Sequence, residues 1–471
     1  MSAAPGQPVI LGESPRLRVL FVAHSYPRFD GDVAGSFLLR LARALREHED
    51  IAVCALAPSA PGLPPHDVVG GVRVERVRYA PAAWETLAYE GTMAEAVRTS
   101  WRSRLALAGM LGATWYQTRA SAFRHADVVH AHWWFPGALA AALPGGTHGR
   151  PLVCTMHGSD VRLAARIGPA RALFARVARR CDAVTAVSSW LCAQAGAMSP
   201  GLSCEVAPMP VDADLFRPAP AGHPRGRLLF VGRLTAQKGV DALLRAFARM
   251  RTPAPLVIAG DGPERAALGA LAESLGVEGR IEWRGALPQP ELAGLYRTSR
   301  AVVVPSREEG LGLVAVEAHL SGTPVVAFAS GGLPDVVRDG ENGWLVEPGD
   351  DGALAAALDA AMADGDRAHA LGASGRAAAL DRFTPRGVAA RYAGIYERVL
   401  AACGLPVCPS AHSPGPAPAR RRHGGHRVVF GFDGSASSDP PPSDVVPADG
   451  APSAAPHPPP HGGRTDTSPR S

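Results

Sequence analysis

The chain has 471 residues, 52 of them glycine and 44 proline, and one hydrophobic core rarely fills this length, so we expect two domains. Its 48 basic and 43 acidic side chains leave a net charge of +5, which is too weak a bias to predict nucleic-acid binding, and no RNA-binding signature accompanies it. No run of about 18 apolar residues occurs, so the sequence predicts no membrane span and favours a soluble, cytoplasmic protein.

The first half of the chain alternates short apolar runs with amphipathic stretches, a pattern typical of parallel α/β sheets. One amphipathic stretch predicts a helix at 36–48. The predicted strands lie at 18–23, 51–57, 72–79, 127–131, 152–156, 183–187 and 204–208. Residues 80–120 break the alternation because their apolar residues do not form one face, and we expect a helical insertion there.

A second series of the same kind follows a segment rich in proline, glycine and alanine, which is typical of a linker. Its predicted strands lie at 227–231, 256–260, 281–285, 301–305, 323–328 and 343–348. Helical patterns lie between these strands at 240–250, 263–276 and 288–299, and further helices are predicted at 351–363, 367–381 and 385–402. The composition after Gly404 is rich in proline and low in apolar residues, which predicts disorder.

Together these patterns predict an α/β protein with two doubly wound, Rossmann-like domains facing each other across a cleft. The predicted parts are an N-terminal domain at 16–215, a linker at 216–226, a C-terminal domain at 227–384, a closing helix at 385–403 and a disordered tail at 404–471. Polar and glycine-rich residues follow the strands of both halves. Open parallel sheets bind ligands beyond the carboxyl ends of their strands, so we expect the ligand in the cleft.

The stretch SREEGLGLVAVEA (306–318) carries the strongest local signal. Gly310 and Gly312 let the backbone approach a ligand closely, and the N-terminus of the helix that follows favours a phosphate. Glu309 lies in the loop and Glu317 in the helix, so two carboxylates are available for the paired hydroxyls of a ribose and a hexose. The alternative is a capped helix with two solvated glutamates.

Further segments in the second half favour a nucleotide-sugar site. VGRLTAQKG (231–239) places Arg233 and Lys238 after a predicted strand, as cations for a diphosphate. With GDGPE (260–264), EGLGLVAVE, SGTPVVA, GGLPDVV and NGWLV following in this order, residues 16–400 resemble the retaining GT-B glycosyltransferases of family four. The resemblance implies a nucleotide-diphosphate sugar as co-substrate and no metal or other cofactor. It also implies a closing helix that packs back on the N-terminal domain.

The same resemblance implies roles on the donor side of the cleft. Arg233 and Lys238 would bind the donor diphosphate and offset the charge of the leaving nucleotide. Glu309 would hold the hydroxyls of the donor sugar, and Glu317 those of the ribose. The backbone expected beside the sugar and the phosphate is that of Gly310, Leu311 and Gly312.

On the N-terminal side, His157 in MHGSD follows a predicted strand and would face the donor sugar, so His157 and Glu309 are the predicted catalytic residues. The alternative for His157 is a core histidine bonded to the backbone. Asp160 either orients the acceptor or caps the next helix. Gly35, in DGDVAGSF, resembles the family's flexible glycine loop beside the acceptor or phosphate, and Asp32 either touches the acceptor or belongs to a turn.

Three further features leave the assignment in place. His130 and His132 of HAHWW point the same way on a strand, as a metal pair would, but no third ligand accompanies them, so we predict acceptor surface and no metal site. The seven cysteines are scattered without a CxxC pair, which predicts free thiols in a reducing compartment. Pro210 stands where the family usually has glycine, so the local backbone geometry is expected to differ from the family's while the activity is kept.

The resemblance implies transfer with retention of anomeric configuration and without a metal, the departing diphosphate assisting the acceptor hydroxyl. Closure of the cleft would exclude water. The acceptor class implied is a glycan, a glycolipid or another hydroxyl compound of cell-surface polysaccharide synthesis. Two alternatives remain: a sugar-nucleotide epimerase of similar fold, and a catalytically inert sugar-nucleotide-binding protein.

An arginine-rich stretch suggests a membrane partner. With Leu173, Phe174 and Val177 turned inward, Arg171, Arg176 and Arg180 could lie against an anionic membrane surface. This would place the protein peripherally on the inner face of the membrane, beside a lipid-linked acceptor. The alternative is a solvated helix face.

Overall fold

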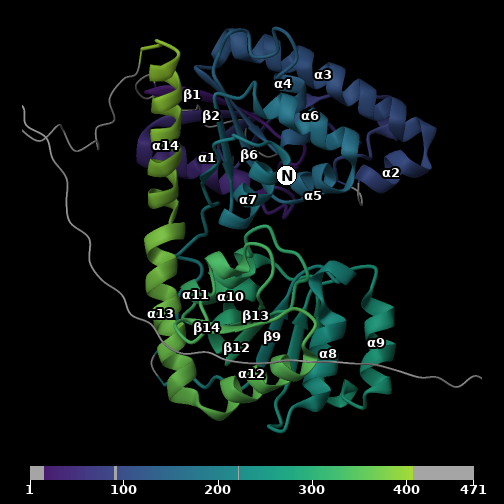
Figure 1. Cartoon of the computed structure of the whole chain (residues 1–471), viewed down its shortest axis with the longest axis vertical. Helices are drawn as coiled ribbons and strands as arrows, with labels where there is room; N and C mark the ends of the chain where they lie inside the picture. Colours follow the sequence, from purple (N-terminus) through teal and green to yellow (C-terminus); the bar gives the residue numbers. More distant parts are fainter. Residues whose placement is uncertain (1–14, 90–92, 221, 407–471) are drawn as a thin grey trace, which may run out of the picture. The chain divides into compact units, whose positions relative to one another are not determined.

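Two β-sheets, one in each half of the chain, form the framework of the protein (Figure 1). The computed structural model describes residues 15–89, 93–220 and 222–406, without the side chains of 122–125. The predicted disordered tail lies outside the described residues from position 407 onward. Both sheets fall inside the ranges predicted for the two domains, and each has the parallel pairing expected of a doubly wound fold.

The N-terminal sheet has eight strands in the order β3-β4-β2-β1-β5-β6-β7-β8. Their bounds are β1 Leu17–Val22, β2 Ile51–Pro58, β3 His66–Val69, β4 Val72–Val77, β5 Val128–His132, β6 Leu152–Met156, β7 Ala183–Ala186 and β8 Glu205–Val206. All neighbours pair in parallel except β3, which runs antiparallel to β4 at the edge of the sheet. The sequence did not predict β3, because this short edge strand buries only Val69.

Helices flank this sheet along most of its width. They are α1 Ser36–Glu49, α2 Met93–Thr99, α3 Trp101–His125, α4 Leu139–Ala141, α5 Ser159–Arg166, α6 Gly168–Ala178 and α7 Ser189–Met198, with short turns η1 Ala82–Trp84 and η2 Trp134–Ala138. α2 and α3 supply the predicted helical insertion, and α3 packs on β1, β2 and β4. The insertion therefore belongs to the N-terminal half.

The C-terminal sheet has six parallel strands in the order β11-β10-β9-β12-β13-β14. Their bounds are β9 Leu228–Val231, β10 Leu256–Ala259, β11 Ile281–Gly285, β12 Ala301–Val304, β13 Val325–Phe328 and β14 Gly343–Val346. The chain proceeds outward from β9 in one direction and from β12 in the other. The order therefore reverses between these two neighbouring strands, which is the position where doubly wound sheets bind ligands.

Helices of the C-terminal half follow the predicted pattern closely. They are α8 Val240–Arg249, α9 Arg265–Ser274, α10 Gln289–Thr298, α11 Leu313–Leu320, α12 Asp351–Ala363 and α13 Gly365–Phe383, with turns η3 Ala236–Lys238, η4 Glu278–Arg280 and η5 Leu333–Asp335. In α8 the spacing of Val240, Leu243, Leu244 and Phe247 places all four side chains on one buried face. This spacing explains why the sequence alone located the helix.

The last helix, α14 Pro385–Ala402, packs back on the N-terminal half against α1 (Figure 1). The Tyr392 hydroxyl donates to the carbonyl oxygen of Ala207 at 2.9 Å, and Arg398 pairs with Glu205 beside β8. Thr384 caps the helix with its side chain, and Pro385 occupies the first turn, where a missing N–H costs nothing. The structure thus confirms the predicted closing helix.

One prediction about the cysteines is wrong. Cys192 of α7 and Cys204 next to β8 form a disulfide bond. α7 packs against β8, which brings the two Cα atoms to 5.4 Å although no CxxC spacing announces the pair. Among the described cysteines, Cys54, Cys154, Cys181 and Cys403 are free thiols, as predicted.

Buried histidines should make the folded protein less stable in acid. Burial lowers the pKa of His24 to about 4, of His130 to about 3 and of His319 to about 4. Because these folded-state values lie below the ordinary 6.5, the unfolded chain alone takes up protons as the pH falls through 6.5. Each histidine should then cost about 2 kcal/mol at pH 5 relative to neutral pH.

Calorimetry at pH 7.5 and pH 5 tests this expectation, and Tm should fall markedly at the lower pH. His319 donates from Nε2 to the carbonyl oxygen of Asn342 at 3.1 Å. The variant His319→Gln can keep that bond without titrating, so it should lose about 2 kcal/mol of the pH dependence. Equal Tm values at both pH values would contradict the buried neutral state.

Candidate active site

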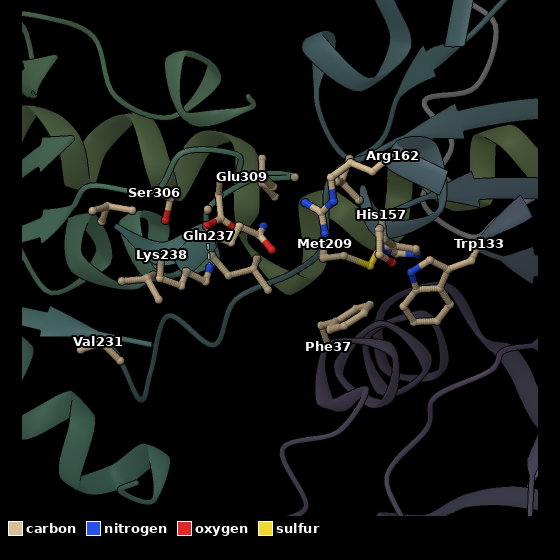
Figure 2. Close-up of a pocket in the computed structure, with 18 of the residues that line it drawn as sticks. Phe37, Trp133, His157, Arg162, Met209, Val231, Gln237, Lys238, Ser306 and Glu309 are labelled. Carbon is tan, nitrogen blue, oxygen red and sulfur yellow. Dashed lines mark hydrogen bonds and ion pairs between the residues drawn. The ribbon is translucent and has the colours of Figure 1, made fainter. Parts of the chain in front are cut away.

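A cavity of about 390 Å³ lies where the carboxyl ends of the two sheets meet. Figure 2 shows Phe37, Trp133 and His157 on one side of it and Lys238 and Glu309 on the other. The first three belong to the segments that follow β1, β5 and β6, and the last two to the segments that follow β9 and β12. Both sheets thus meet at the strands where their order reverses, and the cleft expected from the sequence is present.

The loop after β12 brings the two halves into backbone contact. Gly312, the residue before α11, has φ +88°, a conformation that other residues rarely adopt. A Cβ atom at Gly310 would collide with the carbonyl oxygen of His157, so only glycine allows the two strand ends to approach this closely. Gly310, Leu311 and Gly312 all line the cavity, at the N-terminus of α11. Their predicted backbone contacts with sugar and phosphate stay a prediction.

Lys238 and Glu309 form an ion pair at the cavity wall, with Nζ 2.6 Å from Oε2. Their side chains are 25% and 16% exposed, so water screens the pair only in part. The Lys238 ammonium keeps two further N–H donors, and Oε1 of Glu309 forms no hydrogen bond within the described part of the chain. The pair therefore offers a cation for a phosphate and an acceptor for a hydroxyl within one side-chain length of each other.

Two glycine-rich turns brace the loops that carry this pair. The N–H of Gly332 donates to the carbonyl oxygen of Glu309 at 2.9 Å, and Gly331 has no room for a side chain beside the Glu309 backbone. The backbone carbonyl oxygen of Asp261, in the GDGPE turn, accepts from the N–H of Leu234 at 2.9 Å and so holds the loop after β9. The GGLPDVV and GDGPE motifs thus stabilise the loops at the cavity through backbone hydrogen bonds.

Two predicted donor residues do not line the cavity. Arg233 is exposed, and its guanidinium forms no hydrogen bond or ion pair within residues 15–89, 93–220 and 222–406. Glu317 is 7% exposed and accepts from the Tyr296 hydroxyl at 2.8 Å. Burial raises the pKa of the Glu317 carboxyl, while the Tyr296 hydroxyl and the charge of Arg40 oppose that shift. The roles of Arg233 and Glu317 in donor binding stay predictions.

His157 faces the cavity at the end of β6. Its Nε2 lies 3.2 Å from Nδ1 of His132, and its ring packs 4.6 Å from that of Trp133 and 5.1 Å from that of Phe37. Burial lowers the pKa of His157 well below its ordinary value, so the imidazole is neutral. The structure contradicts the alternative of a core histidine bonded to the backbone, because the observed partner is a side chain. The catalytic role stays a prediction.

Asp160 lies beneath the loop that carries His157. Its carboxylate is 3% exposed and accepts the backbone N–H groups of Trp134 and Gly158 at 3.0 Å and of His157 at 3.3 Å. Burial raises the pKa of Asp160, and these N–H groups oppose the shift. Asp160 does not line the cavity, so the observed contacts favour a role in holding the loop over contact with an acceptor.

The loop between β1 and α1 has the glycine geometry expected from the sequence. Gly35 has φ +68° and directly precedes α1, and a Cβ atom there would lie 2.6 Å from the carbonyl oxygen of Ser25. Asp32 accepts from Arg28 and from the N–H of Ala34, which makes it a turn residue. Neither Gly35 nor Asp32 lines the cavity, whereas Phe37, two positions after Gly35, does.

The prediction that His130 and His132 form acceptor surface is wrong. Both side chains are 0% exposed, because β5 lies in the middle of the sheet and is covered by α14. His130 contacts the Tyr396 hydroxyl through Nδ1 at 2.8 Å and the Thr155 hydroxyl through Nε2 at 2.7 Å. Within the described ranges no three His, Cys, Asp or Glu side chains are grouped as a metal site.

The cavity residues that sequence reasoning missed include Phe37, Trp133 and Arg162. Trp133 directly follows β5 and has φ +67°, and Arg162 is in α5, five positions after His157. Arg162 Nε lies 3.6 Å from Oε2 of Glu308, and Arg166 lies 3.7 Å from the same carboxylate, so this glutamate links the two halves. Its position just after a parallel strand is the signal that could have identified Trp133.

The arginine-rich helix α6 borders a second hollow of about 390 Å³. Leu139, Leu173 and Val177 lie at its apolar side, and the arginines that line it are Arg176, Arg179 and Arg180. Phe174 and Val177 are buried, as predicted, whereas Leu173, also predicted to face inward, is only partly buried. Arg171 donates to the carbonyl oxygen of Ala197 and Arg180 to that of Ala142. None of the helices in the described ranges is long and apolar enough to cross a bilayer.

Comparison with known proteins gives the family. The model described as glycosyl transferases group 1 matches residues 214–378, and the one described as Glycosyltransferase Family 4 matches residues 34–215. A GDP-mannose-dependent alpha-(1-6)-phosphatidylinositol monomannoside mannosyltransferase of Mycolicibacterium smegmatis is 34% identical over 285 residues, covering 55% of this chain and 74% of its own. A D-inositol 3-phosphate glycosyltransferase of Xylanimonas cellulosilytica is 34% identical over 404 residues, covering 77% and 92%.

The fold has solved counterparts. The structure of sucrose-phosphate synthase from Thermosynechococcus elongatus matches with a TM-score of 0.69 at 24% identity, covering 82% of this chain and 99% of that one. The two-sheet architecture is therefore the GT-B fold. The chain belongs to the family 4 glycosyltransferases and is a glycosyltransferase, which confirms the family and the enzyme class predicted from the motifs.

The contact between Gly310 and His157 gives a testable prediction. In the variant Gly310→Ala the new Cβ must displace the His157 carbonyl, and overpacking of this kind costs about 1–3 kcal/mol. Because the strain falls on the meeting point of the two halves, kcat/KM should drop about tenfold or more. Gly294→Ala, on α10 with no atom near its Cβ, is the matched control and should keep full activity. Unchanged kinetics in Gly310→Ala would contradict the close approach.

Proposed function

We propose that this enzyme transfers a hexose-type sugar from a nucleotide-diphosphate sugar to an acceptor hydroxyl, with retention of anomeric configuration. The observation that carries the proposal is the Lys238–Glu309 pair beside the N-terminus of α11, facing His157 across the cavity. A diphosphate sugar has both of the groups that this pair can bind. The phosphates suit Lys238 and the helix N-terminus, and the sugar hydroxyls suit Glu309.

The donor diphosphate carries its negative charge into a site with few compensating groups. Lys238 lies at the cavity wall, and exposed Arg233 follows the same strand, so both can approach the phosphates as the donor binds. We propose that these cations stabilise the leaving nucleotide and that no metal is required. The departing diphosphate then takes the proton of the acceptor hydroxyl on the same face of the sugar, so neither Glu309 nor Glu317 acts as a general base.

The acceptor is proposed to bear a phosphate. Arg162 lines the N-terminal side of the cavity, where two N–H groups of its guanidinium can bind two oxygens of a phosphate. The two relatives named above act, by their names, on a phosphatidylinositol mannoside and on an inositol phosphate. A phosphorylated polyol or a glycolipid built on one fits this side of the cavity, and such products enter cell-surface glycoconjugates.

A membrane-bound acceptor calls for a membrane-facing surface, and we propose that α6 provides it from the cytoplasmic side. Arg176 near the end of α6 and Arg179 and Arg180 just after it rim an apolar hollow, a combination that suits an anionic lipid surface. Each arginine near such a surface contributes about 1 kcal/mol of attraction. Two of the cluster's members, Arg171 and Arg180, also bond to backbone carbonyls, so the helix face has a structural role as well.

The donor site is tested by the variant Glu309→Gln. It removes the charge that pairs with Lys238 and weakens an acceptor for sugar hydroxyls, so kcat should fall about 100-fold. Tm should change little because the pair is partly exposed. Turnover is measured with GDP- and UDP-sugars and a panel of phosphorylated polyols, with and without EDTA, and Glu341→Gln on an exposed pair is the control.

Other outcomes of that assay point to other functions. An epimer of the intact donor, formed without acceptor, would indicate an epimerase. Donor binding without turnover across the panel would indicate an inert binding protein. Near-normal turnover of Glu309→Gln would mean that the site is elsewhere, and loss of activity with EDTA would contradict the metal-free proposal.

The membrane surface is tested with the double variant Arg176→Gln/Arg179→Gln. Its affinity for vesicles that contain anionic lipid, measured by sedimentation, should fall about 10- to 30-fold, because two attractions of about 1 kcal/mol are lost. The pair Arg284→Gln/Arg338→Gln, on exposed positions of the C-terminal half, should bind as the unmodified enzyme does. Equal binding of both variants would assign the arginines of α6 to a solvated face.

A further inference from the structure

Three histidines from neighbouring strands converge beneath the cavity, and their arrangement goes beyond what the family assignment explains. His130 and His132 are on β5 and His157 follows β6. The ring centroids of His130 and His132 are 4.1 Å apart, and those of His132 and His157 are 5.3 Å apart. Only His157 lines the cavity, so the other two histidines need a different reason for being buried.

His130 belongs to a hydrogen-bond chain in which every polar atom has a partner. The Thr185 hydroxyl donates its single proton to the carbonyl oxygen of Cys154. It must therefore accept the hydrogen bond from the Thr155 hydroxyl, which lies 2.6 Å away. His130 then donates from Nε2 to Thr155 over 2.7 Å and accepts at Nδ1 from the Tyr396 hydroxyl over 2.8 Å. This chain fastens α14 to the sheet, which is a structural role.

His132 lacks such a complete set of partners. Its Nδ1 lies 3.2 Å from Nε2 of His157, but its Nε2 is buried and has no hydrogen-bond partner within the described part of the chain. The neighbouring Phe21 ring, 4.6 Å away and nearly perpendicular, offers no conventional acceptor. Leaving a buried polar atom unpaired costs free energy, so a residue placed there invites a functional explanation.

The tautomers of the two rings are linked. Burial lowers the pKa of both His132 and His157 well below the ordinary value, so each neutral ring carries one proton. If His132 donates from Nδ1, its buried Nε2 is an unused lone pair and His157 carries its proton on Nδ1. If His157 donates instead, the buried Nε2 of His132 is an unpaired N–H. Unpaired buried N–H groups are rarer than unused acceptors, so the first arrangement is favoured.

We propose that His132 is a positioning residue for the transfer reaction. Its Nδ1–H donates to Nε2 of His157 and thereby holds His157 in the tautomer whose Nδ1–H is presented to the cavity. This Nδ1 forms no hydrogen bond within the described residues, and His157 lies at the cavity wall opposite Lys238 and Glu309 (Figure 2). It is free to donate to an oxygen of the bound nucleotide sugar.

This inference rests on the proposed function and adds a reason for the buried pair. A fixed, neutral N–H donor needs no protonation and no reorientation as charge develops on the leaving group, and preorganised donors of this kind strongly affect catalysis. Without His132, the His157 ring is free to adopt the other tautomer and to rotate. The loss should then appear in kcat more than in donor affinity.

The first test is spectroscopic and uses the full chain labelled with ¹⁵N-histidine. Two-bond ¹H–¹⁵N spectra distinguish a protonated Nδ1 from a protonated Nε2, and single His→Gln variants assign the signals. His157 should show a protonated Nδ1 and a bare Nε2 in the unmodified enzyme. A protonated Nε2 on His157 would overturn the proposal, whatever the enzyme transfers.

The second test compares His132→Phe with His132→Asn. The phenyl ring fills the space without a donor, so kcat should fall about 100-fold while the donor KM changes less than threefold. The side-chain amide of asparagine can place an N–H near the position of Nδ1, so His132→Asn should recover at least a tenth of the original kcat. Equal losses in both variants would reduce His132 to a packing residue.

The matched control is Tyr396→Phe, which removes a hydrogen bond from the same buried cluster without touching His157. It should lower Tm but leave kcat within threefold of the original. A kcat loss as large as that of His132→Phe would show that any damage to the cluster suffices, which overturns the specific role. Binding of GDP- and UDP-sugars to the unmodified enzyme is measured separately, so failure of the proposed function is distinguished from failure of this inference.

Discussion

The two halves of the enzyme meet through backbone, and the absence of a side chain at Gly310 makes that meeting possible. The loop after β12 touches the carbonyl of His157 at the end of β6, where any Cβ atom would collide. The cavity, the ion pair and the neutral histidine all lie within this region of contact. If the two loops lay farther apart, Lys238 and Glu309 would face water and would no longer lie opposite His157. The geometry of the site therefore depends on this contact.

The charges around the cavity are arranged asymmetrically. The C-terminal wall combines the Lys238–Glu309 pair with the N-terminus of α11, and the N-terminal wall offers Arg162 and the neutral ring of His157. Cationic side chains therefore occur on both sides, whereas the carboxylate on the cavity wall is on one side only. This division suits a donor held mainly by the C-terminal half and an anionic acceptor held by the other.

The sequence predicted the framework well because parallel strands and amphipathic helices have strong periodic signals. Residues 351–363 and 385–402 were predicted as helices with the bounds that the structure shows. The edge strand β3 escaped notice because it buries little. The disulfide between Cys192 and Cys204 escaped because it depends on the packing of α7 beside β8, and local spacing carries no trace of that contact.

The sequence identified residues that line the cavity where a motif places the backbone, and it failed where burial decides. Glycine positions 310 and 312 followed from turn geometry, whereas the burial of His130 involves Tyr396 of α14, which arrives from far along the chain. For the same reason Glu317 faces Tyr296, a contact that the helix spacing alone does not reveal.

The central claim, that a nucleotide sugar occupies the cavity between the two halves, is tested most directly by hydrogen–deuterium exchange. Saturating GDP- or UDP-sugar should slow amide exchange both around residues 157–162 and around residues 306–314, because ligand contacts from opposite walls restrain both loops. Protection of neither segment by any donor, or of one segment alone, would contradict a site built from both halves.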